Sequence, residues 1–154
     1  MYDPTIILVC LFILSLQTVF AYLSAPNTSA DHLLYAVIWT WLHLLQFTVS
    51  NQSLNPDEDA LNKPWRPIPS GLISVGYARA LRWILLPLCF FFSVCLGTHW
   101  QGISLALAFV AHNELHLHSH WMMRNVCNAW GYASFNAGAS AIAAGTFHTV
   151  FLFT

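Results

Sequence analysis

The stretch Leu33–Val49, LLYAVIWTWLHLLQFTV, contains no charged side chain. A helix needs about 20 mostly apolar residues to cross the ~30 Å hydrocarbon core of a bilayer, so this stretch predicts a membrane-spanning helix. Two polar side chains, His43 and Gln46, interrupt it. Because polar groups within a membrane seldom face lipid, we expect both to face the interior of a helical bundle. There they line a substrate pocket or hydrogen-bond between helices.

Four further apolar runs flank this one, which predicts about five spans; they cover approximately Thr5–Leu23, Ala80–Gly97, Trp100–Leu115 and Val126–Phe153. The chain has 154 residues, of which 57% are hydrophobic and 7% charged. Soluble domains carry about 25% charged residues, so an ordinary soluble domain is excluded. We expect an all-α, polytopic transmembrane helical bundle that forms a single transmembrane domain over residues 1–154.

The first run resembles a signal peptide, but residues 1–4 carry Asp3 and no Lys or Arg. The run is also longer than the apolar region of a usual signal peptide, so we expect a retained span. Nucleic acid is not an expected partner. The net charge is −1, whereas nucleic-acid binding depends on clustered Lys and Arg.

The distribution of Lys and Arg predicts the orientation in the membrane. With five spans, the 51–76 loop and Arg124 lie on one face, whereas the loops 25–32 and 97–101 contain no Lys or Arg. By the positive-inside rule the first face is cytoplasmic. The expected location is the endoplasmic reticulum membrane, with another membrane as the alternative. Glycosylation-type triplets at Asn27 and Asn51 lie on opposite predicted faces.

Most of the charged residues lie in one region, between 51 and 82, and they are Asp57, Glu58, Asp59, Lys63, Arg66, Arg79 and Arg82. The region begins with NQSLNPDEDALNKPWRPIPSG, residues 51–71. If the preceding helix continues, the oxygens of Asn51, Asn55 and Asp59 share one face, since they are four residues apart. Mg²⁺ prefers oxygen ligands and often bridges carboxylates to a phosphate.

Lys63 and Arg66 follow at a distance where they can meet the remaining phosphate charge. The alternative is a polar cytoplasmic loop whose charges only set the topology. The order of the residues favours the first interpretation.

That order resembles the first aspartate-rich motif of the UbiA-type intramembrane prenyltransferase superfamily, NDxxDxxxD, with its following NKPxRPxPSG-like segment. The matching residues are Asn51, Asp59, Asn62, Lys63, Pro64, Arg66, Pro67, Pro69, Ser70 and Gly71. Gln52 and Asn55 stand where the family has its first two aspartates. Asp57 and Glu58 add carboxylates nearby, so the metal ligands differ from the common pattern.

Later segments resemble the fungal branch of membrane-bound terpene cyclases; they are Asn113-Glu114-Leu115, His120-Trp121, Arg124-Asn125, Asn128-Ala129, residues 131–135 and Gly138-Ala139. The resemblance implies Mg²⁺ as cofactor and an isoprenoid diphosphate as substrate, for terpene cyclisation or prenyl transfer in terpenoid biosynthesis. It also implies a set of site residues. The catalytic ones are Asp59, Lys63 and Arg66; the diphosphate ligands are Lys63, Arg66, Arg124 and Asn125; the metal ligands are Asn51, Asn55, Glu58 and Asp59.

The resemblance covers the N-terminal half of the family fold. Members of the superfamily have about twice as many spans and a second aspartate-rich motif, and no acidic cluster follows Asp59 here. We expect one of three explanations: a truncated product, a half that pairs with a second chain, or a non-catalytic relic. The non-enzyme alternative is therefore a pseudoenzyme or membrane scaffold.

The histidines provide a competing signal. His112, His116 and His120 are spaced four apart, so on one helix they would share a face with Glu114 nearby, as a transition-metal site requires. This predicts, as the weaker alternative, a His-box di-iron oxidase. The other interpretation is a polar helix end at the membrane interface, with His118 among its residues.

Overall fold

The computed structural model describes residues 16, 18–20, 22–24 and 29–145, and its regular elements in these ranges are helices. Residues 16, 18–20 and 22–24 are helical, and the elements that follow are α2 (Ala30–Leu54), α3 (Pro56–Asn62), α4 (Val75–Cys95), α5 (His99–Asn113), the 3₁₀ turn η1 (Leu117–Ser119) and α6 (Trp121–Ala143). The expected all-α bundle is confirmed for the described part of the chain.

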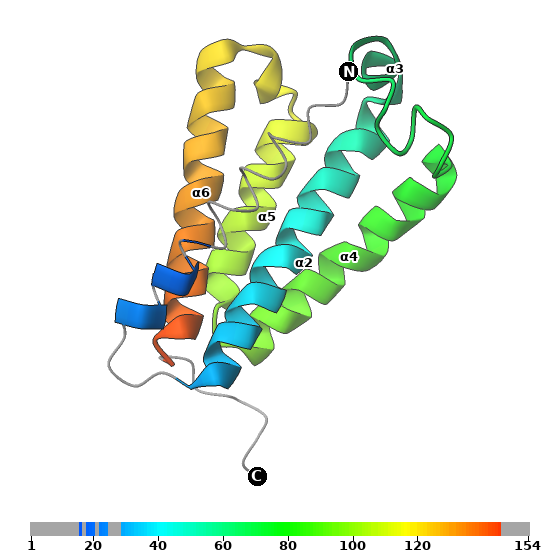
Figure 1. Cartoon of the computed structure of the whole chain (residues 1–154). Helices are drawn as coiled ribbons and strands as arrows, with labels where there is room; N and C mark the ends of the chain where they lie inside the picture. Colours follow the sequence, from blue (N-terminus) through cyan, green and yellow to red (C-terminus); the bar gives the residue numbers. More distant parts are fainter. Residues whose placement is uncertain (1–15, 17, 21, 25–28, 146–154) are drawn as a thin grey trace.

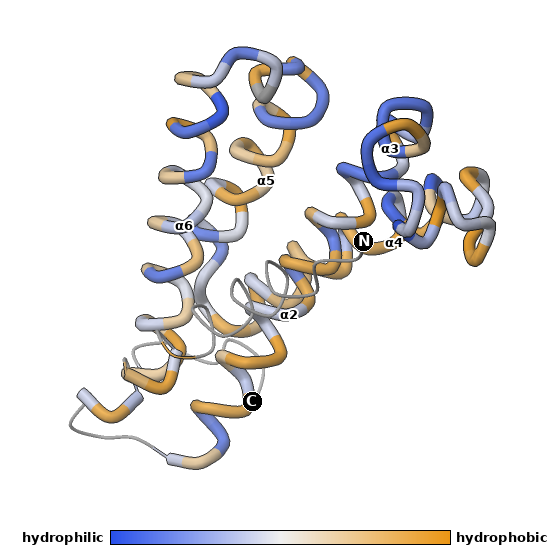
Figure 2. Tube along the Cα trace, turned by 45° about the horizontal axis from the view of Figure 1, so that its top comes forward, coloured by the Kyte–Doolittle hydropathy of each residue, from blue (hydrophilic) through white to orange (hydrophobic). Residues whose placement is uncertain are grey.

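Helix α2 occupies the centre of the bundle and contacts α4, α5 and α6. α3 and the connection between α5 and α6 lie at one end of the bundle, drawn at the top of Figure 1. The start of α2 and the connection between α4 and α5 lie at the other end. Hydrophilic residues gather around α3 and the α5–α6 connection, as Figure 2 shows. We call the end with α3 the polar end.

The segment 51–76 is not a continuous loop, and this corrects the sequence expectation. α2 extends through Leu54, and α3 follows after the single non-helical residue Asn55, so the longer irregular stretch is limited to the residues between Asn62 and Val75. Pro56 begins α3, because proline is tolerated in the first turn of a helix. Ser74 caps α4, since its hydroxyl accepts a hydrogen bond from the Tyr77 backbone N–H at 3.2 Å.

The core is built around Trp39, which is fully buried. Its Nε1 donates to Ser93 Oγ on α4 at 2.9 Å, and Ser93 Oγ also lies 3.2 Å from His43 Nε2. Gly138 on α6 lies directly against the Trp39 ring. His43 and Gln46 are both buried, which confirms that they face the bundle interior.

Two described helices, α2 and α4, are long and apolar enough to cross a membrane. α5 has 15 residues, so it spans only about 22 Å. α6 has 23 residues but includes Arg124 and several asparagines. The first expected span lies largely outside the described residues, as do residues 146–153 of the last. The total of about five spans stays a prediction.

Candidate functional site at the polar end of the bundle

Asp59 and Arg66 form the central pair of the site. Arg66 Nη1 donates to Asp59 Oδ1 at 2.8 Å and to Oδ2 at 2.6 Å. Asp59 is buried in α3, while Arg66 is partly exposed in the segment that follows. Hydrogen bonds between charged groups are stronger than those between neutral ones, so this pair ties the end of α3 to the proline-rich segment.

Asn51 joins this pair from the last turn of α2. Arg66 Nη1 lies 3.4 Å from Asn51 Oδ1, and Asn51 Nδ2 donates to Asn113 Oδ1 at 3.0 Å. Asn113 is the last residue of α5 and is fully buried. Side chains from α2, α3, α5 and the 63–74 segment therefore form one hydrogen-bonded group, which we call the Arg66 cluster: Asn51, Asp59, Arg66 and Asn113.

The prediction that Asn51, Asn55 and Asp59 share one face of a continuous helix is wrong. α2 stops at Leu54, and Asn55 has φ −122° and ψ 54°, which is not helical. The cause is Pro56, because a residue that precedes proline is driven away from the α region. Asn51 and Asp59 still come together, through Arg66 and not through a shared helix face.

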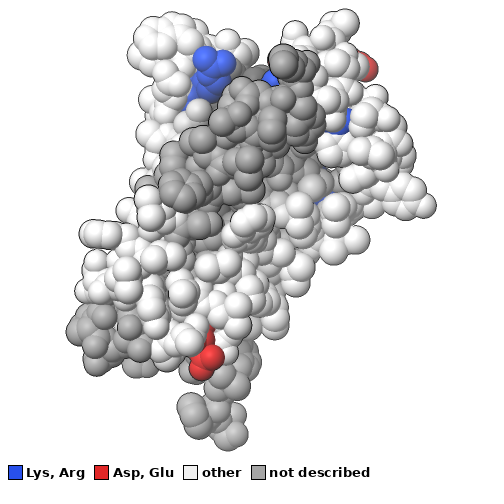
Figure 3. Space-filling view, viewed as in Figure 1, with Lys and Arg blue, Asp and Glu red and all other residues white. Residues whose placement is uncertain are grey.

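The remaining expected site residues are also at the polar end. Glu58 and Lys63 are exposed on and just after α3, and Asn55 is partly buried at the α2–α3 break. Arg124 and Asn125 are exposed on the first turns of α6. Figure 3 shows that the Lys and Arg side chains visible on that face lie in its upper part, toward the polar end. No hydrogen bond in the described part brings Arg124 or Asn125 into the Arg66 cluster.

The histidines do not share a helical face, which corrects the arrangement expected for an iron site. α5 ends at Asn113, and His116 adopts a left-handed backbone with φ 51°. His120 occupies the N-cap position of α6, with extended backbone and no side-chain capping hydrogen bond. In the described part of the chain no three His, Cys, Asp or Glu side chains are grouped to hold a metal. The segment joins the end of α5 to the start of α6, and its position at a membrane interface stays a prediction.

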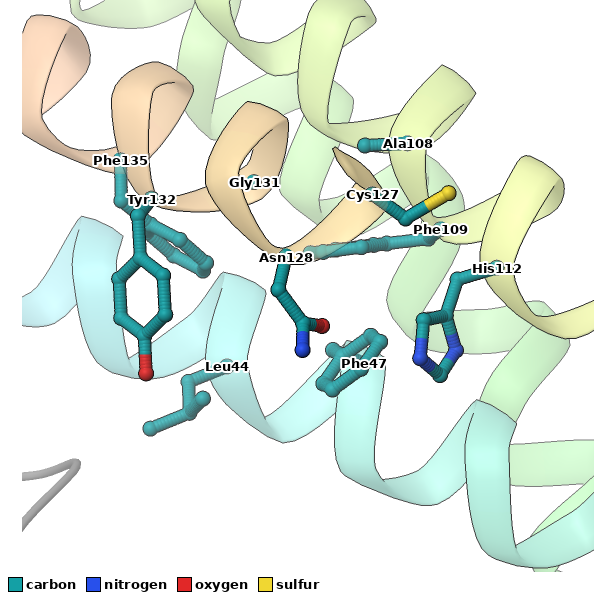
Figure 4. A pocket seen from close by; sticks show the side chains of 10 residues that line it. All are labelled: Leu44, Phe47, Ala108, Phe109, His112, Cys127, Asn128, Gly131, Tyr132 and Phe135. Atoms are coloured by element: carbon teal, nitrogen blue, oxygen red, sulfur yellow. The ribbon is translucent and has the colours of Figure 1, made fainter. Parts of the chain in front are cut away.

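An apolar cavity of about 250 Å³ opens between α2, α5 and α6, next to the Arg66 cluster (Figure 4). Asn128 and Tyr132 of α6 point toward α2, where Leu44 and Phe47 face them. His112 belongs to the same wall, and its Nδ1 lies 3.0 Å from Asn113 Oδ1. The cavity is thus connected by hydrogen bonds to the polar cluster.

A second apolar cavity, of about 420 Å³, lies between α2, α4 and α5. Its wall includes His43 and Gln46, and an adjoining hollow reaches an ion pair between Arg82 and Glu114. That pair joins the beginning of α4 to the end of α5. Phe109 lines both cavities and separates them.

Two residues of the site were not predicted from the sequence. Asn113 lies in a segment that resembles terpene cyclases but was not assigned to the site, and His112 was not expected to line a cavity. For Asn113 the sequence did contain an indication. Asn113 is an amide at the end of an apolar run, and such groups usually face a bundle interior. Its partner could not be found, because Asn51 is 62 positions away in the sequence.

The arrangement of an apolar cavity beside a polar cluster agrees with the family comparison. The model of the UbiA prenyltransferase family matches residues 7–154. The chain belongs to this family. Its members are membrane proteins, which agrees with the two apolar helices α2 and α4.

Several curated relatives carry terpene cyclase or synthase names. The chain is 34% identical over 120 residues to a fumagillin beta-trans-bergamotene synthase of Aspergillus fumigatus, which covers 78% of the chain and 41% of the relative. It is 33% identical over 121 residues to a somaliensene A/B synthase of Streptomyces somaliensis, covering 77% and 40%. A diterpene cyclase of Hericium erinaceus is 42% identical over 59 residues, covering 38% and 19%.

The chain therefore spans about 40% of the length of the first two relatives. The expected resemblance to terpene cyclases is confirmed, and it includes a bacterial enzyme as well as fungal ones. No solved structure matches the chain.

Proposed function

We propose that this chain takes part in terpene cyclisation or prenyl transfer, with the diphosphate of an isoprenoid substrate at the polar end of the bundle. The observation that supports it is the position of the Arg66 cluster beside the apolar cavity between α2, α5 and α6. A prenyl diphosphate has the same division into a polyanionic head and an apolar tail. The names of the terpene cyclase relatives agree with it.

The donors at the polar end suit Mg²⁺ by their chemistry. Asp59 offers a carboxylate and Asn51 an amide oxygen, and Glu58 is an exposed carboxylate one residue before Asp59. Hard cations prefer such oxygen ligands. Asn51, Asn55, Glu58 and Asp59 would hold the ion, which would neutralise charge on the departing diphosphate.

Basic side chains of the protein would then neutralise the remaining negative charge of the diphosphate. Lys63 and Arg66 lie on the two sides of Pro64 and Trp65, in the segment that follows α3, and Arg124 lies at the start of α6. Lysine meets phosphate as a point charge and arginine as a planar fork with several donors. As the C–O bond of the substrate ionises, these side chains stabilise the negative charge that develops on the leaving group.

The apolar cavity would hold the tail of the substrate away from water. Its aromatic rings include Phe47, Phe109 and Phe135, and aromatic faces stabilise cations electrostatically. In a cyclase the double bonds of the substrate capture the allylic cation, and in a transferase a separate acceptor does. Of the aromatic residues on α2, Phe47 lines the cavity, whereas Trp39 is in the core and Trp41 is exposed.

The direct test is the conversion of farnesyl or geranylgeranyl diphosphate by the purified chain with Mg²⁺. Lys63→Ala is expected to lower product formation about tenfold to 100-fold, because one exposed cation that faces the diphosphate is lost. Products are measured by gas chromatography. Asp31→Ala, which removes an exposed charge in the first turn of α2 at the other end of the bundle, is expected to retain full activity.

A second candidate, a membrane scaffold without catalysis, is favoured by two observations. Gln52 and Asn55 replace two carboxylates of the family motif, and Asp59 is already paired with Arg66. If the unmutated chain forms no product while it remains folded, this candidate replaces the enzyme.

We further propose that the polar end faces the cytoplasm, as the Lys and Arg side chains there indicate. Asn51 is a poor reporter of orientation, because its amide is bonded to Asn113. Cysteine labelling is better suited. Leu72 and Trp100 are 79% and 71% exposed and lie at opposite ends of the described bundle.

In sealed microsomes an impermeant maleimide is expected to label Leu72→Cys, whereas Trp100→Cys reacts only after detergent is added. The unmutated chain gives the background from its own thiols. The reverse pattern would show that the polar end is lumenal.

A further inference from the structure

We infer that Asn113 is a positioning residue of the proposed diphosphate site: it fixes the orientation of Asn51 and, through Asn51, supports the Arg66 guanidinium. This inference rests on the proposed function for its consequence in catalysis. The hydrogen bond by which Asn113 holds the Asn51 side chain can be tested separately from catalysis.

The geometry gives Asn113 this role because the two ends of an amide differ. Asn51 Nδ2 donates to Asn113 Oδ1 at 3.0 Å, so the carbonyl end of Asn51 is left to face Arg66 Nη1, 3.4 Å away. If Asn51 turned over, it would present two N–H donors to a guanidinium that has only donors. The oxygen of Asn113 therefore selects the orientation in which Asn51 stabilises Arg66.

Asn113 also connects the polar cluster to the apolar cavity. Its Oδ1 lies 3.0 Å from Nδ1 of His112, whose ring lines the cavity and meets the Phe47 ring edge-on at 5.4 Å between centroids. The Oδ1 atom of Asn113 thus contacts two groups: the amide of Asn51, a proposed metal ligand, and the ring of His112, which lines the cavity proposed for the apolar tail of the substrate.

The burial of Asn113 indicates that it is not present for packing. The side chain is fully buried, and its Nδ2 has no hydrogen-bond partner within the described structure. A buried donor without a partner is destabilising, whereas a leucine of similar shape would carry no such penalty. The acceptor oxygen is what an apolar side chain could not supply.

The test measures hydrogen exchange of the Asn51 side-chain amide in the full chain, labelled with ¹⁵N-asparagine and held in nanodiscs. The Asn51 signal is assigned by its loss in Asn51→Ala. Asn113→Leu is expected to accelerate this exchange about tenfold, the effect of losing one buried hydrogen bond. Asn113→Asp keeps an acceptor oxygen and is expected to retain the protection. Ser93→Ala, which removes a buried hydroxyl from the core around Trp39, is the matched control and is expected to leave the signal unchanged.

If Asn113→Leu does not fold, Asn113→Ala removes the oxygen without adding bulk, and the same acceleration is expected. Unchanged protection in a folded Leu or Ala variant would overturn the inference, and so would equal loss in Asn113→Asp. Binding of Mg²⁺ and inorganic pyrophosphate to the unmutated chain is measured by calorimetry in the same nanodiscs. Absent binding would count against the proposed function alone, because the exchange result still decides the role of Asn113.

Discussion

Replacing Asp59 by alanine is expected to abolish product formation, with a loss of about 100-fold or more. Asp59 is a proposed metal ligand and the partner of Arg66, so its removal takes away a carboxylate and releases a guanidinium from its place. Removal of one preorganised electrostatic group from an active site typically costs about 10²–10³ in rate. Product formation from farnesyl or geranylgeranyl diphosphate with Mg²⁺ is the measurement.

The difficulty with this variant is that it also leaves a half-buried cation without its partner. Breaking a buried ion pair from one side costs about 3–5 kcal/mol, and a pair that is partly exposed costs less. Thermal unfolding in detergent therefore has to accompany the activity. The double variant Asp59→Ala/Arg66→Ala removes both charges and is expected to recover much of the stability and none of the activity.

Activity that returned in the double variant would show that the loss in Asp59→Ala was a folding defect. Full activity of a folded Asp59→Ala chain would contradict the role of this carboxylate altogether. Asp31→Ala serves again as the charge control from the opposite end of the bundle.

The sequence was most informative where side-chain chemistry restricts the backbone. Pro56 explains both the break at Asn55 and the start of α3, because proline restricts the residue before it and suits the first turn of a helix. The expectation of a continuous helix from Asn51 to Asp59 did not take the effect of Pro56 on Asn55 into account. His43 and Gln46 were placed correctly, since polar groups in an apolar run seldom face lipid.

In the histidine segment the helix ends at Asn113, although no Gly or Pro between residues 113 and 120 marks its end. His116 adopts φ 51°, a left-handed conformation that is uncommon outside glycine, although Asn, Asp and His adopt it more often than other residues. A spacing of four residues predicts a shared face only while the helix continues, and here it stops at Asn113. The turn η1, which follows His116, packs against α5 and α6, and such tertiary contacts are not written in the local sequence.

Three members of the Arg66 cluster could be predicted from the sequence, namely those from α2, α3 and the proline-rich segment. The fourth member, Asn113 of α5, could not. Asn51, Asp59 and Arg66 were recognised because they are close in sequence and match a family motif. Asn113 enters through the packing of α5 beside α2, which places residues 51 and 113 within hydrogen-bond distance. Such a pair follows from tertiary structure, which the spacing of residues does not describe.

The same dependence on packing underlies the last prediction, which concerns Gly138. A Cβ atom at this position would lie 2.3 Å from Cη2 and 2.7 Å from Cζ3 of Trp39. The indole cannot move away freely, because it is fully buried and its Nε1 is bonded to Ser93. Gly138→Ala is therefore expected to separate α2 from α6, although alanine is the better helix former.

Overpacking of this kind typically costs about 1–3 kcal/mol. In a chain of this length about 2 kcal/mol lowers the unfolding midpoint by roughly 4–8 °C, and thermal unfolding in detergent measures it. Gly131→Ala is the matched control on the same helix, since a Cβ there meets nothing within 4 Å. It is expected to keep or raise the midpoint, because alanine favours a helix over glycine by about 1 kcal/mol. Equal midpoints for the two variants would show that α6 does not pack on Trp39, and the cavity between α2, α5 and α6 would lose one of its walls.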